Sequence, residues 1–129
     1  MKEYKMKPKF HKHLIVRAEV ENPPTAPEEI NQWIKNLVEK IGMKIMLGPF
    51  SAYCPVTGNR GLTAVTIIET SHIAIHVWDE VYPALMQLDV YTCSSLDPVD
   101  VTDAIKVFNP IKTEIKYLDR EHGLTEISI

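Results

Sequence analysis

The segment GLTAVTIIETSHIAIHVW, residues 61–78, decides the fold class of this 129-residue chain. β-branched residues dominate both of its halves, 62–68 and 73–77, and such runs are typical of β-strands. Polar residues around Thr70 and Ser71 separate the two halves. We therefore expect two strands joined by a short connection, which favours antiparallel pairing.

Upstream of this segment, the pattern predicts a strand followed by a helix. Residues 13–20, HLIVRAEV, predict a first strand, which the sequence ENPPT ends. Thr25 and Glu28 have the spacing of a capping box, and Pro27 suits a first helical turn. Apolar residues then recur at helical spacing as far as Gly42. These residues are Ile30, Ile34, Leu37, Val38 and Ile41.

Three further strands and one loop are expected around these elements. Residues 43–47 alternate as in a strand, and turn-forming residues predict a loop over 48–61. Residues 86–93 also alternate, and 111–118 form the last predicted strand. The polar face of 86–93 carries Gln87, Asp89, Tyr91 and Cys93, and the other face carries Met86, Leu88, Val90 and Thr92.

A second helix should begin at Asp97 and Pro98, which suit an N-cap and a first helical position. Its buried stripe would contain Val101, Ala104, Ile105 and Phe108. About six strands and two helices with short connections predict an α+β fold, a two-layer α/β sandwich. Its sheet would be mostly antiparallel, with both helices on one face.

Composition predicts one soluble domain over residues 13–129 after a basic, flexible arm over 1–12. The arm contains Lys2, Lys5, Lys7, Lys9 and Lys12. The whole chain is nevertheless mildly acidic, with 14 basic and 17 acidic residues, so we expect no nucleic-acid partner. No apolar stretch is long enough to span a membrane, and the start lacks the apolar core of a secretory signal. The only cysteines, Cys54 and Cys93, favour a reducing compartment, the cytoplasm.

The histidines of the central segment raise a problem of distance. His72 and His76 would lie about 13 Å apart in an extended strand, too far to share one metal ion, so no metal is expected. Ser71 and His76 would lie about 16 Å apart and on opposite faces. They can act together only if the chain bends sharply at Thr70 and Ser71, or if the histidine comes from another copy of the protein.

The same residues resemble the prokaryotic S-adenosylmethionine decarboxylase family. Its pattern runs Glu-Ser-His, three residues, His-Thr-Trp-Pro-Glu, and later Asp-Val-Phe-Thr-Cys-Gly. This chain has TSH at 70–72, HVWDE at 76–80 and DVYTCS at 89–94. GLTAV at 61–65 is similar to the family's Gly-Val-Ser-Gly-Val, and His13-Leu14 to its early His-Leu.

The resemblance implies a decarboxylase that makes its own pyruvoyl cofactor and uses no metal. Cleavage between Thr70 and Ser71 would convert Ser71 into the pyruvoyl group, with His76 as the base for elimination. Thr63 would steady the oxygen intermediate, where the family has serine. The pyruvoyl ketone would form a Schiff base with the substrate and accept electrons as carbon dioxide leaves. Cys93 would reprotonate the α-carbon.

The resemblance also implies the substrate, S-adenosylmethionine, and a partner, a second copy of the chain. Trp78 would stack on the adenine and Glu80 would take the ribose hydroxyls, with Tyr53 as a second stacking ring. In a homodimer, Ser71 and Cys93 of one protomer would meet Thr63 and His76 of its mate. The product would serve spermidine synthesis.

Four departures from the family pattern keep two alternatives open. Thr70 replaces the family's glutamate at the bond to be broken, and its β-branch crowds the carbonyl that Ser71 must attack. Asp79 replaces proline, Ser94 replaces glycine, and VRAE at 16–19 replaces the early Asp-x-Tyr-Gly-Cys. The first alternative is the same chemistry on ornithine or arginine. The second is an unprocessed, non-catalytic homologue that binds a ligand.

Overall fold

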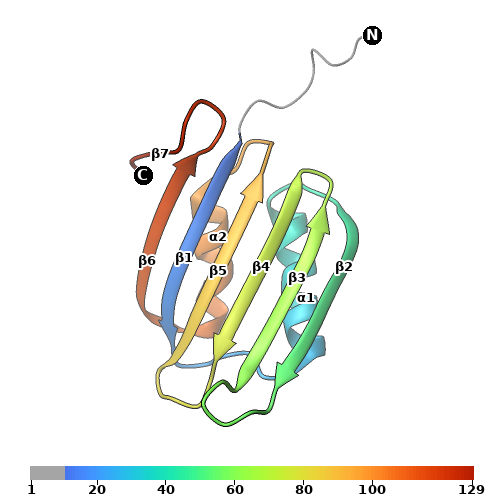
Figure 1. Ribbon diagram of the computed structural model, residues 1–129, viewed down its shortest axis with the longest axis vertical. Coiled ribbons are helices and arrows are strands. Elements are labelled where there is room, and N and C mark those ends of the chain that lie inside the picture. The colour runs from blue at the N-terminus through green and yellow to red at the C-terminus, as the bar shows by residue number, and fades with distance from the viewer. Residues whose placement is uncertain (1–10) are drawn as a thin grey trace.

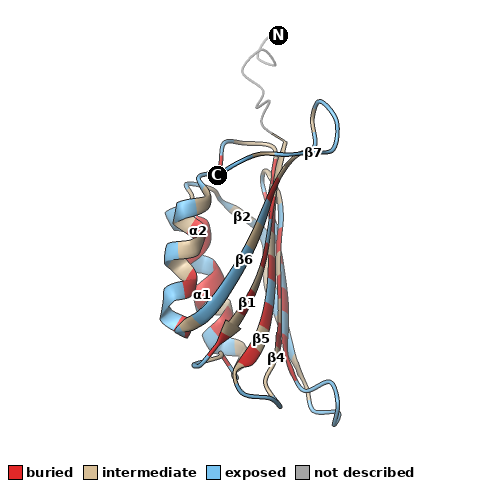
Figure 2. Ribbon diagram, turned by 90° about the vertical axis from the view of Figure 1, so that its left-hand side faces the viewer, coloured by how far each residue is buried: buried red, intermediate tan, exposed pale blue. Residues whose placement is uncertain are grey.

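A seven-stranded antiparallel sheet forms one layer of the protein, and two helices on one of its faces form the other (Figures 1 and 2). The computed structural model describes residues 11–129. The strand order is β2-β3-β4-β5-β1-β6-β7, and every adjacent pair is antiparallel. The predicted α+β sandwich is confirmed.

The elements follow the predicted order along the chain. The strands are β1 Lys12–Val20, β2 Ile45–Cys54, β3 Gly61–Ile68, β4 Ser71–Trp78, β5 Ala84–Thr92, β6 Pro110–Asp119 and β7 Thr125–Glu126. The helices are α1 Pro27–Lys40 and α2 Pro98–Ala104, which continues into the 3₁₀ turn η2 Ile105–Phe108. Among residues 11–129, no helix is long and apolar enough to cross a membrane.

The hydrophobic core lies between the sheet and the two helices. α1 buries Ile30, Ile34 and Leu37 against the sheet, as its helical spacing predicts. The indole N–H of Trp33 donates to the carbonyl of Ala104 at 2.9 Å and so joins α1 to α2. No helix of the described chain covers the other face of the sheet, here called the open face (Figure 2).

The hairpin of β3 and β4 confirms the prediction made from residues 61–78. Only Glu69 and Thr70 separate the two strands. Gly61 has a φ of 148°, and a Cβ built on it would lie 1.7 Å from the carbonyl oxygen of Val77. Only glycine fits this close contact between the two strands.

Three local predictions were wrong. The expected loop over 48–61 is mostly strand, because β2 continues to Cys54. β2 is an edge strand and therefore tolerates Pro49. Its register with β3 shifts on both sides of Leu47. α1 begins after Ala26, so Glu29 rather than Glu28 reaches back to the backbone N–H of Thr25, at 3.1 Å.

The third error concerns the N-terminal arm. Lys12 is the first residue of β1 rather than the last residue of the arm, and residues 1–10 lie outside the described part of the chain. In contrast, the predicted N-cap of α2 is confirmed, since the Asp97 carboxylate accepts the N–H of Val99 at 3.0 Å.

Candidate active site

The bond predicted to break lies at the turn between β3 and β4. Ser71 has a φ of 140°, in the region that normally requires glycine, and such backbone strain costs on the order of 1–3 kcal/mol. The carbonyl oxygen of Thr70 accepts the backbone N–H of Cys93 at 2.8 Å. The structure therefore brings the Thr70–Ser71 bond beside the backbone of Cys93, as predicted.

A second group lies farther along β4, on the open face. The Thr63 hydroxyl oxygen lies 3.1 Å from His76 Nδ1, because these residues are directly opposite in β3 and β4. The rings of His76 and Trp78 are stacked, with centroids 6.0 Å apart and planes at 28°. His76 also lines a hollow of about 440 Å³ that extends to Gln87 and Asp89.

The two groups do not meet within one protomer. Ser71 and His76 belong to the same uninterrupted strand, five residues and about 16 Å apart. The turn falls before Ser71, so it does not fold the serine toward the histidine. Ser71 is in register with Ile68 and Thr92, which are buried on the helix side, whereas His76 lies on the open face.

The polar groups of all three predicted substrate residues have partners in this structure, and those of Tyr53 and Glu80 lie away from the open face or hold a turn. Tyr53 packs against the core on the helix side, and its hydroxyl donates to Asp79 at 2.9 Å. Within one protomer, the ring of Tyr53 and the open-face ring of Trp78 therefore lie on opposite faces of the sheet. Glu80 accepts the backbone N–H of Gly58 at 2.8 and 3.0 Å, so its carboxylate holds the turn between β2 and β3.

A cluster near the Ser71 end of the open face was missed by the sequence reasoning. Asp89 Oδ1 lies 3.3 Å from Nε2 of His13 and 3.3 Å from Nε2 of His72. Tyr91 lies against both imidazoles, with centroid distances of 5.4 and 5.7 Å. The Arg120 guanidinium lies 4.1 Å from the centre of the Tyr91 ring. The other four residues share one face of β5 and its two neighbours, β1 and β4, and Arg120 reaches them from the end of β6.

The hydrogen bonds within this cluster fix the state of His13. Arg120 can only donate, so its contact with His13 Nδ1 at 3.2 Å makes that nitrogen an acceptor and places the ring proton on Nε2, toward Asp89. Burial lowers the pKa of His13 from its usual 6.5 more strongly than the hydrogen bond to Asp89 raises it; the charge of Arg120 lowers it further. His13 is therefore neutral at pH 7.

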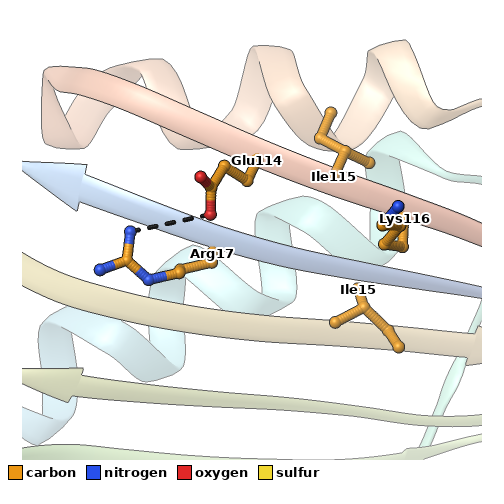
Figure 3. A pocket seen from close by; sticks show the side chains of 5 residues that line it. All are labelled: Ile15, Arg17, Glu114, Ile115 and Lys116. Carbon is orange, nitrogen blue, oxygen red and sulfur yellow. Dashed lines mark ion pairs between the residues drawn. The ribbon is translucent and has the colours of Figure 1, made fainter.

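The open face also has a hollow of about 600 Å³ between β1 and β6 (Figure 3). Arg17 and Glu114 reach toward each other across it, 3.9 Å apart, while Ile15 and Lys116 lie at its other end. Within residues 11–129, no group of three or more His, Cys, Asp or Glu side chains is arranged to hold a metal ion.

Comparison with known proteins gives the family. The chain matches the S-adenosylmethionine decarboxylase family over residues 12–121. It belongs to that family. Members of this family of decarboxylases are carboxy-lyases.

Individual relatives agree with this assignment. The S-adenosylmethionine decarboxylase proenzyme of Methanococcus maripaludis is 32% identical over 99 residues, 75% of each chain. The proenzyme of Methanococcus vannielii is 30% identical over 100 residues, covering 76% of this chain and 75% of the relative. The crystal structure of the adenosylmethionine decarboxylase from Aquifex aeolicus superposes with a TM-score of 0.64 and 25% identity, covering 94% and 98% of the two chains.

Proposed function

We propose that this protein is a self-processing, pyruvoyl-dependent decarboxylase of S-adenosylmethionine that supplies its product to spermidine synthesis. The observation that carries the proposal is the Thr70–Ser71 turn. A serine there has a glycine-like φ, and the preceding carbonyl accepts a backbone N–H at 2.8 Å. Both features favour attack on that carbonyl, through backbone strain and through stabilisation of negative charge on its oxygen.

Maturation would be performed by side chains of this chain. The Ser71 hydroxyl attacks the Thr70 carbonyl carbon, the C–N bond breaks, and the proton lost by the hydroxyl ends on the Ser71 nitrogen. His76 of the partner subunit then removes the α-proton of Ser71, which expels the Thr70 carboxylate, and hydrolysis releases ammonia. The resulting pyruvoyl ketone would act as the electron sink for decarboxylation.

Cys93 is the residue best placed to protonate the product carbon. Its backbone N–H binds the carbonyl at the cleavage site, and its side chain is half-buried and free of any disulfide. A partly accessible thiol can give up a proton and recover it from water. Its position at the end of β5 keeps it beside residue 71 before and after cleavage.

We further propose a homodimer in which Ser71 and Cys93 of one protomer act with Thr63 and His76 of the partner subunit. The support is the distance of about 16 Å along β4, which one protomer does not close. The open face also leaves large apolar side chains uncovered: Val65 and Ile67 are each 46% exposed, and Ile15 is 40% exposed. Uncovered apolar groups on a sheet face favour association.

Substrate recognition is assigned chiefly to Trp78. Its indole is stacked with the His76 ring on the open face, and an indole face suits stacking of a flat purine and attraction of the sulfonium. The Glu80 carboxylate, which also accepts the N–H of Gly58, is the group assigned to the ribose hydroxyls. We also expect the enzyme to work in the cytoplasm, since both cysteines are free thiols.

Intact-protein mass spectrometry tests self-processing directly. The expected result is two fragments, 1–70 and 71–129, the second blocked by a pyruvoyl group. A single full-length mass after long incubation would refute the enzyme and leave a ligand-binding homologue.

The substrate and the oligomeric state need separate tests. Release of labelled carbon dioxide from S-adenosylmethionine, compared with ornithine and arginine, identifies the substrate; release from an amino acid alone would refute the nucleoside substrate. A dilution series identifies the active species. A fully processed, active monomer would refute the shared site.

A further inference from the structure

The turn that joins β2 to β3 is tied to the end of β4 from both sides. Glu80 accepts the backbone N–H of Gly58 at 2.8 Å and that of Arg60 at 3.4 Å. The Arg60 guanidinium lies 3.8 Å from the same carboxylate. Asn59 stands between these two anchored residues, so its backbone position is fixed.

The side chain of Asn59 is oriented by two partners. Its amide oxygen accepts the indole N–H of Trp78 at 2.8 Å, and its amide nitrogen donates to the sulfur of Cys54 at 3.7 Å. Because one end of the amide faces a donor and the other an acceptor, the amide has one favourable orientation. In that orientation the amide oxygen accepts the only N–H of the indole, and this hydrogen bond restricts rotation of the ring.

We propose that Asn59 is a positioning residue for Trp78 and that it sets the plane on which a flat ring of the substrate stacks. The inference rests on the proposed function of Trp78 in binding the adenine. Without Asn59, the indole would rotate away from its stacked position beside His76, and stacking on the substrate would weaken in the substrate complex and in the transition state alike. Such a loss raises KM and leaves kcat unchanged.

A double-mutant cycle separates positioning from a direct contact with substrate. Asn59→Ala should raise KM by roughly threefold to tenfold, the effect expected from losing one hydrogen bond. Trp78→Phe keeps a stacking ring but removes the N–H. If Asn59 acts through the indole, Asn59→Ala adds nothing in the Trp78→Phe background. Equal effects in both backgrounds would overturn the proposal.

The control for the cycle is Thr57→Ala, an exposed change in the same turn that should leave KM unchanged. If Thr57→Ala raised KM as much as Asn59→Ala, the turn as a whole rather than the amide would be responsible. That result would also overturn the proposal.

The hydrogen bond has a readout that needs no activity. The chain contains two tryptophans, so ¹H–¹⁵N spectra should show two indole N–H signals, assigned with Trp78→Phe. Asn59→Ala should shift the Trp78 signal and speed its exchange with water. The Trp33 signal, whose N–H is bound to Ala104, should stay in place.

These measurements keep two failures apart. An unchanged Trp78 signal in Asn59→Ala would overturn the positioning role even in a fully active enzyme. A changed signal together with unchanged KM would show that the indole plane does not matter for binding. Absence of decarboxylation by the wild type would refute the proposed function, while the spectra would still test the hydrogen bond.

Discussion

The two faces of the sheet differ in what they contain and in how completely they are packed. On the helix side, strand residues such as Ile68, Ile73 and Met86 are almost fully buried beneath α1 and α2. On the open face, the same strands carry His72, His76 and other polar residues among half-exposed apolar ones. One face is therefore packed for stability of the protomer, and the other is left uncovered with its polar and apolar side chains accessible.

The comparison is sharpest at single residues that are neighbours in sequence. Ile67 and Ile68 have the same side chain, but Ile67 is 46% exposed and Ile68 is 1% exposed. A period of two along each strand is enough to produce this difference. Changes on the two faces should therefore separate stability from function.

Ser71→Ala should have the largest effect, a complete loss of self-cleavage and of activity, with the fold retained. The hydroxyl is the attacking group in the proposed maturation, and alanine removes it without adding bulk. Mass spectrometry would show only the full-length chain, and circular dichroism would match that of the wild type. Cleavage at the normal rate in this variant would remove Ser71 as the nucleophile.

Ile68→Ala and Ile67→Ala form a matched pair across the two faces. Ile68→Ala should lower the free energy of unfolding by roughly 2–5 kcal/mol, because it leaves a cavity in the core. Ile67→Ala should destabilise the protomer far less and instead weaken the proposed dimer. Denaturant titrations and sedimentation at several concentrations would measure the two effects; equal destabilisation by both would contradict the difference between the faces.

Cys93→Ala should still form some pyruvoyl group but lower turnover by roughly 100-fold, the lower end of what general acid catalysis contributes. Faulty protonation of the product is a second expected result. Product analysis and kcat, normalised to the amount of processed enzyme, provide the measurement. Wild-type rate and product would exclude the thiol as the acid.

His13→Gln should have the smallest effect, a weaker dependence of the free energy of unfolding on pH. The folded pKa of His13 lies below its usual 6.5, so the unfolded chain binds more protons in the interval between these values. The stabilisation is complete above pH 6.5 and is lost as the pH falls through the folded pKa. Urea titrations from pH 7.5 to 5 should show a shallower loss for His13→Gln. Identical slopes would rule out His13 as the group responsible.

Most of the fold was predictable because alternation and helical spacing are local properties. Residues 61–78 were sufficient to predict the central hairpin, and the alternation of residues 86–93 predicted which side chains of β5 lie on each face. The length of β2 was not predictable, because Gly48 and Pro49 are turn residues that an edge strand accepts only with an irregular register. For that reason Tyr53 was expected in a loop, and its helix-side orientation was missed.

The site was predictable only where its residues lie in consecutive strands. Thr63 and His76 pair across one hairpin, and the family motif marks both. His13 meets both Asp89 and Arg120 only because β1 lies between β5 and β6. Nothing local in the sequence specifies that β1 lies between β5 and β6. The alternation of side chains along β4 and β5 could nevertheless have indicated that Asp89, Tyr91 and His72 share a polar patch.

The strand order has a consequence for a chain cut after Thr70. The first piece would supply β1, β2 and β3, and the second would supply β4 to β7. In the sheet, β1 of the first piece lies between β5 and β6 of the second piece. β3 of the first piece also pairs with β4, the edge strand of the second piece. Two polypeptides would thus remain interlocked as one body, and separating them would require unfolding both.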